Sequence, residues 1–410
     1  MHDPQRILIT GASVAGPAAA FWLARAGHDV TVVEQAPELR PGGQNIDIRA
    51  SGREVIQRMG LEDAVRARNT GEIGTRFLDE DGAVVSEFGV QDGEGHDGPT
   101  AELEILRGAL AGVLVDACPD SVRWRFGVSV VSVDDGADGV DVELSDGTRE
   151  RFDLLVVAEG VGSHTRGLVF GDEPQERPLG MYCSYATIER TVDDDDWWNW
   201  LIVPGARQAG LRPDDEGTTR AMLNFLVDSP TLEGLDGGQL RDALREEFTG
   251  VGWEVPRILD GLDTSDDLYV DYLRQIVCPT WHRGRVVLLG DAAWCVTPLG
   301  GGGTSLAITG AYVLAAYLSQ HEPGDHEQAF AEYEEWMRPL VEDAQDLPPG
   351  TPRIAAPTTR AGAQVLKWGT KIAALPTVQK LASTLTSGPE AERELPVLRE
   401  TGQKPPARRK

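Results

Sequence analysis

Two glycine-rich loops, each placed between a strand-like run and a helix-like run, are the parts of this chain best suited to chemistry. The first is GASVAG at residues 11–16, and the second spans residues 298–303, shortly after Asp291. Unpaired N–H groups at the start of a helix bind phosphate or another anion. A carboxylate such as that of Asp291 accepts hydrogen bonds from sugar-type hydroxyls. Together the loops predict a site for a ligand that carries both phosphate and polyol groups.

A complete βαβ pattern surrounds the first loop. A strand-like run at residues 6–10 precedes it, a helix-like run at 17–26 follows it, and a second strand-like run ends at Glu34. Glu34 lies roughly 20 residues after Gly11, which is the spacing of a carboxylate that binds a nucleotide ribose. Ser13 replaces the middle glycine of the usual fingerprint, and it is still small. The pattern predicts dinucleotide binding; the alternative is a tight turn in an ordinary α/β domain.

Composition excludes several other classes of function. The chain has 410 residues and a net charge of −28, which argues against a nucleic-acid or anionic-membrane partner. Its first lysine is Lys367, so no Walker-type phosphate loop and no Schiff-base lysine precedes that position. The four cysteines form no C-x-x-C pair, so we expect neither a metal site nor a disulfide framework. With no signal-peptide pattern and no long apolar run, we expect a cytoplasmic protein.

The order of expected elements predicts an α/β fold with two domains. A Rossmann-like cofactor domain is expected over residues 1–174 and again over 276–345, with a buried parallel strand at 154–157. The intervening residues 175–275, rich in Trp, Tyr and alternating patterns, predict a β-rich substrate domain. We expect a C-terminal helical segment and then a loose tail, over 346–390 and 391–410 respectively.

Three motifs in a fixed order relate the chain to a known family. They are the N-terminal glycine loop, the stretch from Asp153 to Arg166, and the Gly290-Asp291 motif. In this order they resemble the class A flavoprotein monooxygenases, typified by para-hydroxybenzoate hydroxylase, over residues 5–345. The run at residues 42–48, together with Arg107, is most similar to tetracycline-inactivating enzymes and related antibiotic-tailoring hydroxylases.

The resemblance implies FAD as the cofactor, NADPH or NADH as the co-substrate that reduces it, and dioxygen as a further substrate. It places Glu34 on the adenosine ribose, Arg107 and Asp291 near the flavin's phosphate or ribityl groups, and Asp47 near the flavin. The implied cofactor-binding residues are Gly11, Ser13, Ala15, Gly16, Glu34, Gln35, Asp47, Arg107, Glu159, Gly160, Asp291, Pro298, Gly301 and Gly303.

Several positions depart from the family's pattern. The Asp-Gly pair that the family links to both FAD and NAD(P)H is Glu159-Gly160 here, and the usual histidine after the paired alanines is Trp294. The middle residue of the usual Gly-Gln-Gly is Gly302. The glycine scaffold is retained, so flavin binding is still expected. The departures concern the nicotinamide interaction and the type of reaction.

The family's chemistry is hydroxylation of an electron-rich carbon through a flavin hydroperoxide. The cofactor supplies this chemistry, and the protein supplies placement and excludes water. We therefore expect no protein side chain to act as a nucleophile or as a metal ligand. Trp198 and Trp200, two residues apart on an expected strand, are predicted to line a cavity for an aromatic or polycyclic substrate. Core packing of one of them is the alternative.

Other readings remain open at this point. The departures at Glu159 and Gly302 are compatible with a reductase, an epoxidase or a Baeyer–Villiger oxygenase. A protein that binds a flavin or an aromatic drug without turnover is a further possibility, and both a monomer and a homodimer are open. Residues 198–204 are similar to the W-x-W-x-I-P signature of flavin-dependent halogenases. That match has an extra residue before Pro204 and lacks the upstream lysine, so we interpret it as accidental.

Overall fold

A six-stranded sheet forms the centre of the first domain, and its order is β17-β18-β11-β1-β2-β7. The structure is a computed structural model that describes residues 4–40, 42–89, 103–374 and 393–400. All neighbours in this sheet are parallel except β17 and β18. The strands are β1 (Arg6–Thr10), β2 (Asp29–Glu34), β7 (Arg123–Phe126), β11 (Leu154–Val157), β17 (His282–Arg283) and β18 (Val286–Leu288).

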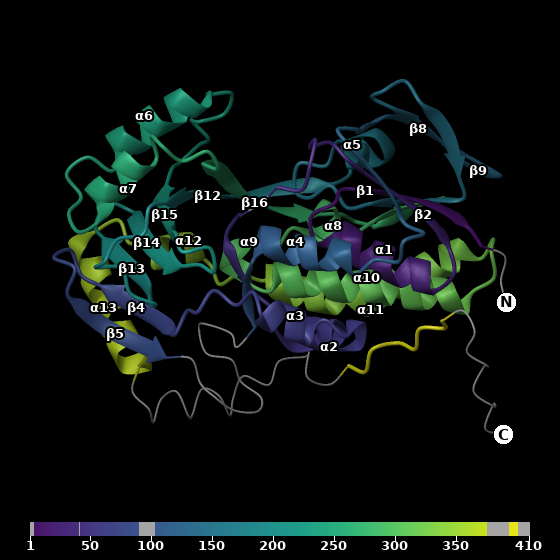
Figure 1. Ribbon diagram of the computed structural model, residues 1–410. Coiled ribbons are helices and arrows are strands. Elements are labelled where there is room, and N and C mark those ends of the chain that lie inside the picture. The colour runs from purple at the N-terminus through teal and green to yellow at the C-terminus, as the bar shows by residue number, and fades with distance from the viewer. Residues whose placement is uncertain (1–3, 41, 90–102, 375–392, 401–410) are drawn as a thin grey trace.

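Layers on both faces bury this sheet, which explains the continuous apolar runs of its middle strands. One layer holds the long helices α1, α10 and α11, which lie side by side with α2 below them (Figure 1). The opposite layer holds a three-stranded sheet and α5. The helices and the further strands of the first domain are α1 (Ala15–Arg25), α2 (Ala50–Met59), α3 (Glu62–Arg66), α4 (Arg107–Asp116), α5 (His164–Phe170), α8 (Asp291–Trp294), α9 (Thr297–Gly300), α10 (Gly303–Gln320), α11 (His326–Gln345), β8 (Val130–Gly136), β9 (Gly139–Leu144) and β10 (Arg149–Phe152).

A seven-stranded sheet forms the second domain, in the order β16-β12-β15-β14-β13-β4-β5. Its two long strands, β12 and β16, run between the two halves of the molecule (Figure 1). The helices α6 and α7 cover one face over a core that includes Leu201 and Val203. The elements are β4 (Gly74–Leu78), β5 (Val84–Gly89), β12 (Gln175–Ile188), β13 (Trp198–Val203), β14 (Arg207–Pro213), β15 (Thr219–Leu226), β16 (Tyr269–Val277), α6 (Gly237–Glu247), α7 (Val255–Gly261), α12 (Thr351–Ala355) and α13 (Arg360–Ala373).

The strands β4 and β5 differ from the sequence prediction. They lie within residues 1–174, where the cofactor domain is expected, but β4 pairs in parallel with β13 and so extends the second sheet. A short antiparallel sheet pairs β3 (Asn45–Asp47) with β6 (Glu104–Leu106). These two strands come before and after β4 and β5 in the chain. Within the expected C-terminal helical segment, the structure contains α12 and α13, and residues 375–390 lie outside the described ranges. None of the helices in the described ranges is long and apolar enough to cross a membrane.

Residues 393–400 also differ from the prediction of a loose tail. The Tyr312 hydroxyl on α10 donates to the Pro396 carbonyl at 2.8 Å, and Arg25 on α1 pairs with Glu400 at 2.7 Å. Leu395 and Leu398 are buried in the core of the first domain. This segment therefore holds α1 and α10 together from outside. Composition alone misses it because the two leucines are its only apolar anchors.

Leu395→Ala is expected to lower the free energy of unfolding by about 2–3 kcal/mol, because it leaves a cavity where a buried leucine packs on the first domain. Urea unfolding followed by circular dichroism measures the change. Val397→Ala is the matched control, since that side chain is 68% exposed. A Leu395→Ala protein as stable as the Val397→Ala protein contradicts the packing described here.

Candidate functional site

Gly11 and Gly16 allow the first loop to pack tightly where β1 meets α1. Gly11 has a φ of +98°, and a Cβ atom there would lie 2.4 Å from the Ala158 carbonyl oxygen at the end of β11. A Cβ atom on Gly16 would lie 1.9 Å from the Gly11 carbonyl oxygen. Ser13 is exposed at the tip of the loop, and Ala15 begins the helix. The loop therefore presents backbone N–H groups at the start of an 11-residue helix.

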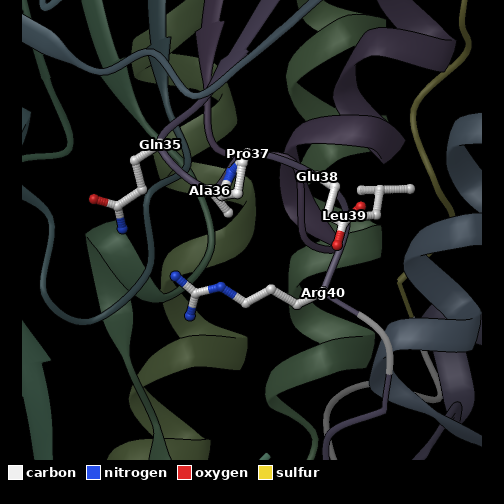
Figure 2. A pocket seen from close by; sticks show the side chains of 6 residues that line it. All are labelled: Gln35, Ala36, Pro37, Glu38, Leu39 and Arg40. Atoms are coloured by element: carbon white, nitrogen blue, oxygen red, sulfur yellow. The ribbon is translucent and has the colours of Figure 1, made fainter.

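Glu34 anchors the end of β2 to this loop. Its carboxylate accepts hydrogen bonds from the backbone N–H groups of Ala12 and Ala36, both at 2.8 Å. Beside it a pocket of about 480 Å³ is lined by residues 35–40. Figure 2 shows the carboxamide of Gln35 and the guanidinium of Arg40 on the same side of this opening. Glu34 and Gln35 are among the residues predicted from the sequence, but Arg40 is not. It follows a proline-containing turn and belongs to no recognisable motif.

Arg107 is a cation next to the glycine loop with an unused donor. Its Nη1 lies 3.4 Å from the Ser13 hydroxyl, and a Cβ atom on Gly43 would lie 3.2 Å from its Nε. That Nε atom is buried and has no hydrogen-bond partner among the described residues. Burying a donor of a charged group without a partner is costly. An anionic group of a ligand is the partner that this position fits.

Asp291 is the first residue of α8 and lies beside the start of α10. The residue reaches solvent, yet the surrounding protein desolvates its carboxyl group enough to raise its pKa, which Arg107 partly opposes. A Cβ atom on Gly303 would lie 3.9 Å from its Oδ1, so the carboxyl group lies next to the first turn of this 18-residue helix. Gly301 and Gly302, with φ of +70° and +68°, bring the chain into the helix, and Pro298 and Gly301 are exposed.

Glu159 has a structural function in the described structure. Its carboxylate accepts hydrogen bonds from the Ser163 hydroxyl at 2.7 Å and from the Thr165 N–H at 2.9 Å. These bonds hold the start of α5, while Gly160 adopts a φ of +81°. Arg166 donates to the Ala292 carbonyl at 3.1 Å and so ties this motif to the one at Asp291. A direct cofactor contact from Glu159 or Gly160 stays a prediction.

Asp47 lies on β3, across from Glu104 on β6, and forms an ion pair with Arg49 at 3.1 Å. Its carboxylate therefore already has a cation. The predicted position near the flavin stays a prediction, and its charge contributes to the environment of the neighbouring side chains on β6.

Trp198 and Trp200 belong to an aromatic row on the face of the second sheet that lies opposite to α6 and α7. Their alternation on β13 puts them opposite to Leu201 and Val203, whose face is covered by the α6 and α7 core. The rings of Trp198 and Trp200 are 4.7 Å apart, and the row continues through Phe77 on β4 to Phe88 on β5. Both tryptophans are half-buried, and their contact with a substrate stays a prediction.

Polar side chains on the same face connect this row to the cofactor side. Tyr185 on β12 is paired in register with Tyr269 on β16. Burial raises the pKa of Tyr185 well above its usual range, so its hydroxyl stays protonated. Burial and then Asp271 raise the pKa of Tyr269, and Arg107 opposes them, so Tyr269 lies where the two domains meet. These tyrosines and the two phenylalanines are not among the residues predicted from the sequence. The alternation of side chains along each strand is the signal that could have indicated them.

The groups on the first domain fit a dinucleotide such as FAD. The glycine loop and the start of α10 offer backbone N–H groups to phosphate oxygens. Arg107 offers a buried donor, and the carboxylates of Glu34 and Asp291 can accept hydrogen bonds from ribose or ribityl hydroxyls.

Comparisons with known proteins agree with this geometry. A family model for an FAD binding domain matches residues 5–347. The chain is 35% identical over 398 residues to the FAD-dependent monooxygenase asL4 of Sarocladium schorii, covering 90% of this chain and 92% of that protein. It is 36% identical over 387 residues to the flavin-dependent monooxygenase eupH of a Phoma species, covering 88% and 90%. The crystal structure of tetracycline destructase Tet(51) matches with a TM-score of 0.78 and 29% identity, covering 94% of this chain and 99% of that one.

These matches confirm the family, the α/β fold and the FAD cofactor that the three motifs predict. The family model and both relatives extend over most of the chain, including the two glycine loops and the Trp198 strand. This chain therefore belongs to the FAD-binding-domain family of flavoprotein monooxygenases, and it is an FAD-dependent monooxygenase.

Proposed function

We propose that this monooxygenase consumes NADPH or NADH and dioxygen and hydroxylates a planar aromatic or polycyclic, polyketide-like small molecule. The observation that carries the proposal is the row of aromatic rings on one face of the second sheet, from Trp198 and Trp200 to Phe77 and Phe88. Flat aromatic side chains bind flat ring systems by offset stacking. The similarity to tetracycline destructase Tet(51), whose name refers to a polycyclic compound, supports this substrate class.

In this proposal FAD, when bound, supplies the activation of dioxygen. The first domain holds the cofactor through the glycine loop, Arg107, Asp291 and the start of α10. The aromatic row orients the substrate ring against it. The protonated hydroxyl of Tyr185 donates a hydrogen bond to a substrate oxygen. This bond fixes the position of the substrate ring along the aromatic row. The wall of indole and phenyl rings excludes water from the reacting atoms.

The proposal is tested by purifying the protein, recording its visible spectrum, and following NADPH and NADH oxidation with a panel of polycyclic phenols that includes tetracyclines. A yellow protein whose oxidation rate rises with one ligand, and whose product gains one oxygen atom, supports it. A product that gains two hydrogens contradicts the proposed hydroxylation. Tight ligand binding without stimulated oxidation shows that the ligand is not the substrate.

Trp198→Ala is expected to weaken binding of the stimulating ligand by about tenfold to a hundredfold, because it removes a ring from the cavity wall. FAD content should not change, since Trp198 lies on the second sheet. Fluorescence titration with the ligand measures the effect. Trp368→Ala is the matched control, because that indole on α13 is 68% exposed. Equal affinities of the two variants would contradict a substrate contact by Trp198.

A further inference from the structure

A buried ionic cluster lies next to the aromatic row, on the same face of the sheet. Arg212 on β14 pairs through Nε with Glu72 at 2.7 Å and through Nη2 with Glu104 at 3.0 Å. The side chains are 13%, 0% and 1% exposed, respectively. The Arg212 guanidinium lies 3.9 Å above the ring of Trp198. The charge of this cluster therefore acts on whatever binds against Trp198.

Two acceptor atoms in the cluster lack a donor. The Asn45 amide nitrogen donates to Glu104 Oε1 at 2.6 Å and to the Pro213 carbonyl at 3.1 Å, so the orientation of the amide is set by two acceptors. The remaining oxygens of the pair, Glu104 Oε2 and Asn45 Oδ1, are both buried without a hydrogen-bond partner in the described part of the chain. Burying two acceptors without hydrogen-bond donors lowers the stability of the folded protein, and here both belong to side chains that are already joined by a hydrogen bond.

A single proton on Glu104 removes this cost. A protonated carboxyl group has one O–H donor, and the only unsatisfied group on its hydrogen-bonded neighbour is an amide oxygen. An acid and an amide can form two antiparallel hydrogen bonds, N–H to Oε1 and O–H to Oδ1. An ionised Glu104 has no donor to offer and leaves both oxygens unpaired.

We propose that Glu104 is protonated in the folded enzyme through its pairing with Asn45, and that it thereby sets the charge that Arg212 presents to the substrate. With Glu104 neutral, the carboxyl groups bonded to the guanidinium carry one negative charge less. The guanidinium Nη1 has no partner among the residues that the structure describes. The cluster then favours a planar aromatic ligand with an ionised oxygen. This last step rests on the proposed function; the protonation does not.

The surrounding charges agree with this assignment. Burial raises the pKa of Glu104 to about 7, Glu72 and Asp47 add to the rise, and Arg212 and the Asn45 hydrogen bond oppose it. The charged groups that face Glu104 are thus Arg212 from β14, Glu72 from the segment before β4, and Asp47 from β3. Glu104 is a positioning residue, because it acts on the substrate only through Arg212.

Glu104→Gln tests the protonation directly, because glutamine has the shape and the hydrogen-bonding pattern of the protonated acid. The free energy of unfolding of the FAD-loaded wild type and variant is compared between pH 4 and pH 9. A pKa raised in the folded state above its ordinary value near 4.5 means that the folded form holds the proton more tightly. The wild type should therefore lose stability relative to Glu104→Gln as the pH rises from about 4.5 through about 7, with no further loss above that.

A different pH dependence would overturn the proposal. If Glu104 is ionised and held by Arg212, the stability of the wild type relative to the variant stays constant from about pH 4.5 to about pH 7, and it rises with pH only below that range. Failure of Glu104→Gln to fold also counts against it, since the variant mimics the proposed form. Glu335→Gln, at an exposed position on α11, controls for the loss of one negative charge. Carbonyl infrared bands of the wild type at pH 5.5 and 8.5 provide a second measurement that needs no stable variant; a protonated-acid band that disappears at the higher pH is expected.

The substrate step is tested with 2-naphthoate, a planar aromatic anion that stays ionised from pH 5.5 to 8.5. The wild type and Glu104→Gln should bind it equally at pH 5.5, while at pH 8.5 the variant should bind about tenfold more tightly. If the wild type and Glu104→Gln bind 2-naphthoate equally at both pH values, Glu104 does not select the charge of the substrate. The protonation of Glu104 would still stand if the stability measurements show the expected pH dependence. Failure of the proposed function itself is seen separately, as no stimulation of NAD(P)H oxidation by any ligand.

Discussion

Asp291→Ala is expected to purify as a colourless protein that has lost FAD. The carboxyl group lies beside the first turn of α10 and close enough to Arg107 for the two charges to interact. It is the group there that can accept hydrogen bonds from the flavin's ribityl or ribose hydroxyls. Losing hydrogen bonds to a charged acceptor costs about 1.5–3 kcal/mol, which weakens FAD binding by roughly tenfold to a hundredfold.

The measurement is the ratio of flavin to protein absorbance after gel filtration, followed by titration with added FAD. Asp343→Ala is the matched control, because Asp343 is an exposed carboxylate on α11. An Asp291→Ala protein that keeps full FAD occupancy would remove Asp291 from the cofactor site. FAD would then be held on this side by Arg107 and the start of α10 without Asp291.

Gly16→Ala is expected to abolish FAD binding and to destabilise the first domain by roughly 3 kcal/mol or more. The added Cβ would lie 1.9 Å from the Gly11 carbonyl oxygen, which is backbone and cannot rotate away as a side chain would. The loop must therefore open. Its backbone N–H groups then no longer point together at the phosphate oxygens of the cofactor. Flavin content and thermal unfolding of the apoprotein measure the two effects.

Gly112→Ala distinguishes this clash from a general intolerance of substituted glycines. Gly112 lies in α4, where a new Cβ would meet no atom within 4 Å. Replacing a helical glycine by alanine stabilises a helix by up to about 1 kcal/mol. We therefore expect a yellow protein at least as stable as the wild type. Normal FAD content in Gly16→Ala would mean that the loop tolerates a wider turn than its geometry indicates.

Local spacing carried the prediction of the cofactor domain. A strand, a glycine loop, a helix and a terminal acid follow one another within residues 6–34, so neighbouring positions in the chain encode the whole unit. The motif at Asp291 is equally local, because a short strand, the acid and the helix start are contiguous. Such units can be identified without knowing how distant segments pair.

The second sheet shows where that reasoning stops. Residues 74–89 have an ordinary hairpin pattern, and nothing in it specifies a partner more than a hundred residues away. The parallel pairing of β4 with β13 results from long-range packing, which also brings Phe77 next to Trp200. The proposed substrate wall thus comes from two distant segments, and the sequence predicts only the one that contains Trp198 and Trp200.

The sequence by itself determined the family, the FAD cofactor and the α/β class, because the residues that specify them are contiguous. It also determined that Trp198 and Trp200 share a face, since strand alternation has a period of two. Only the tertiary structure decided that Glu159 holds a helix, that residues 393–400 pack on α1 and α10, and that Glu104, Asn45 and Arg212 share one buried cluster. Each of these depends on contacts between segments far apart in the chain, and on burial that changes the chemistry of a carboxyl group, neither of which a local pattern encodes.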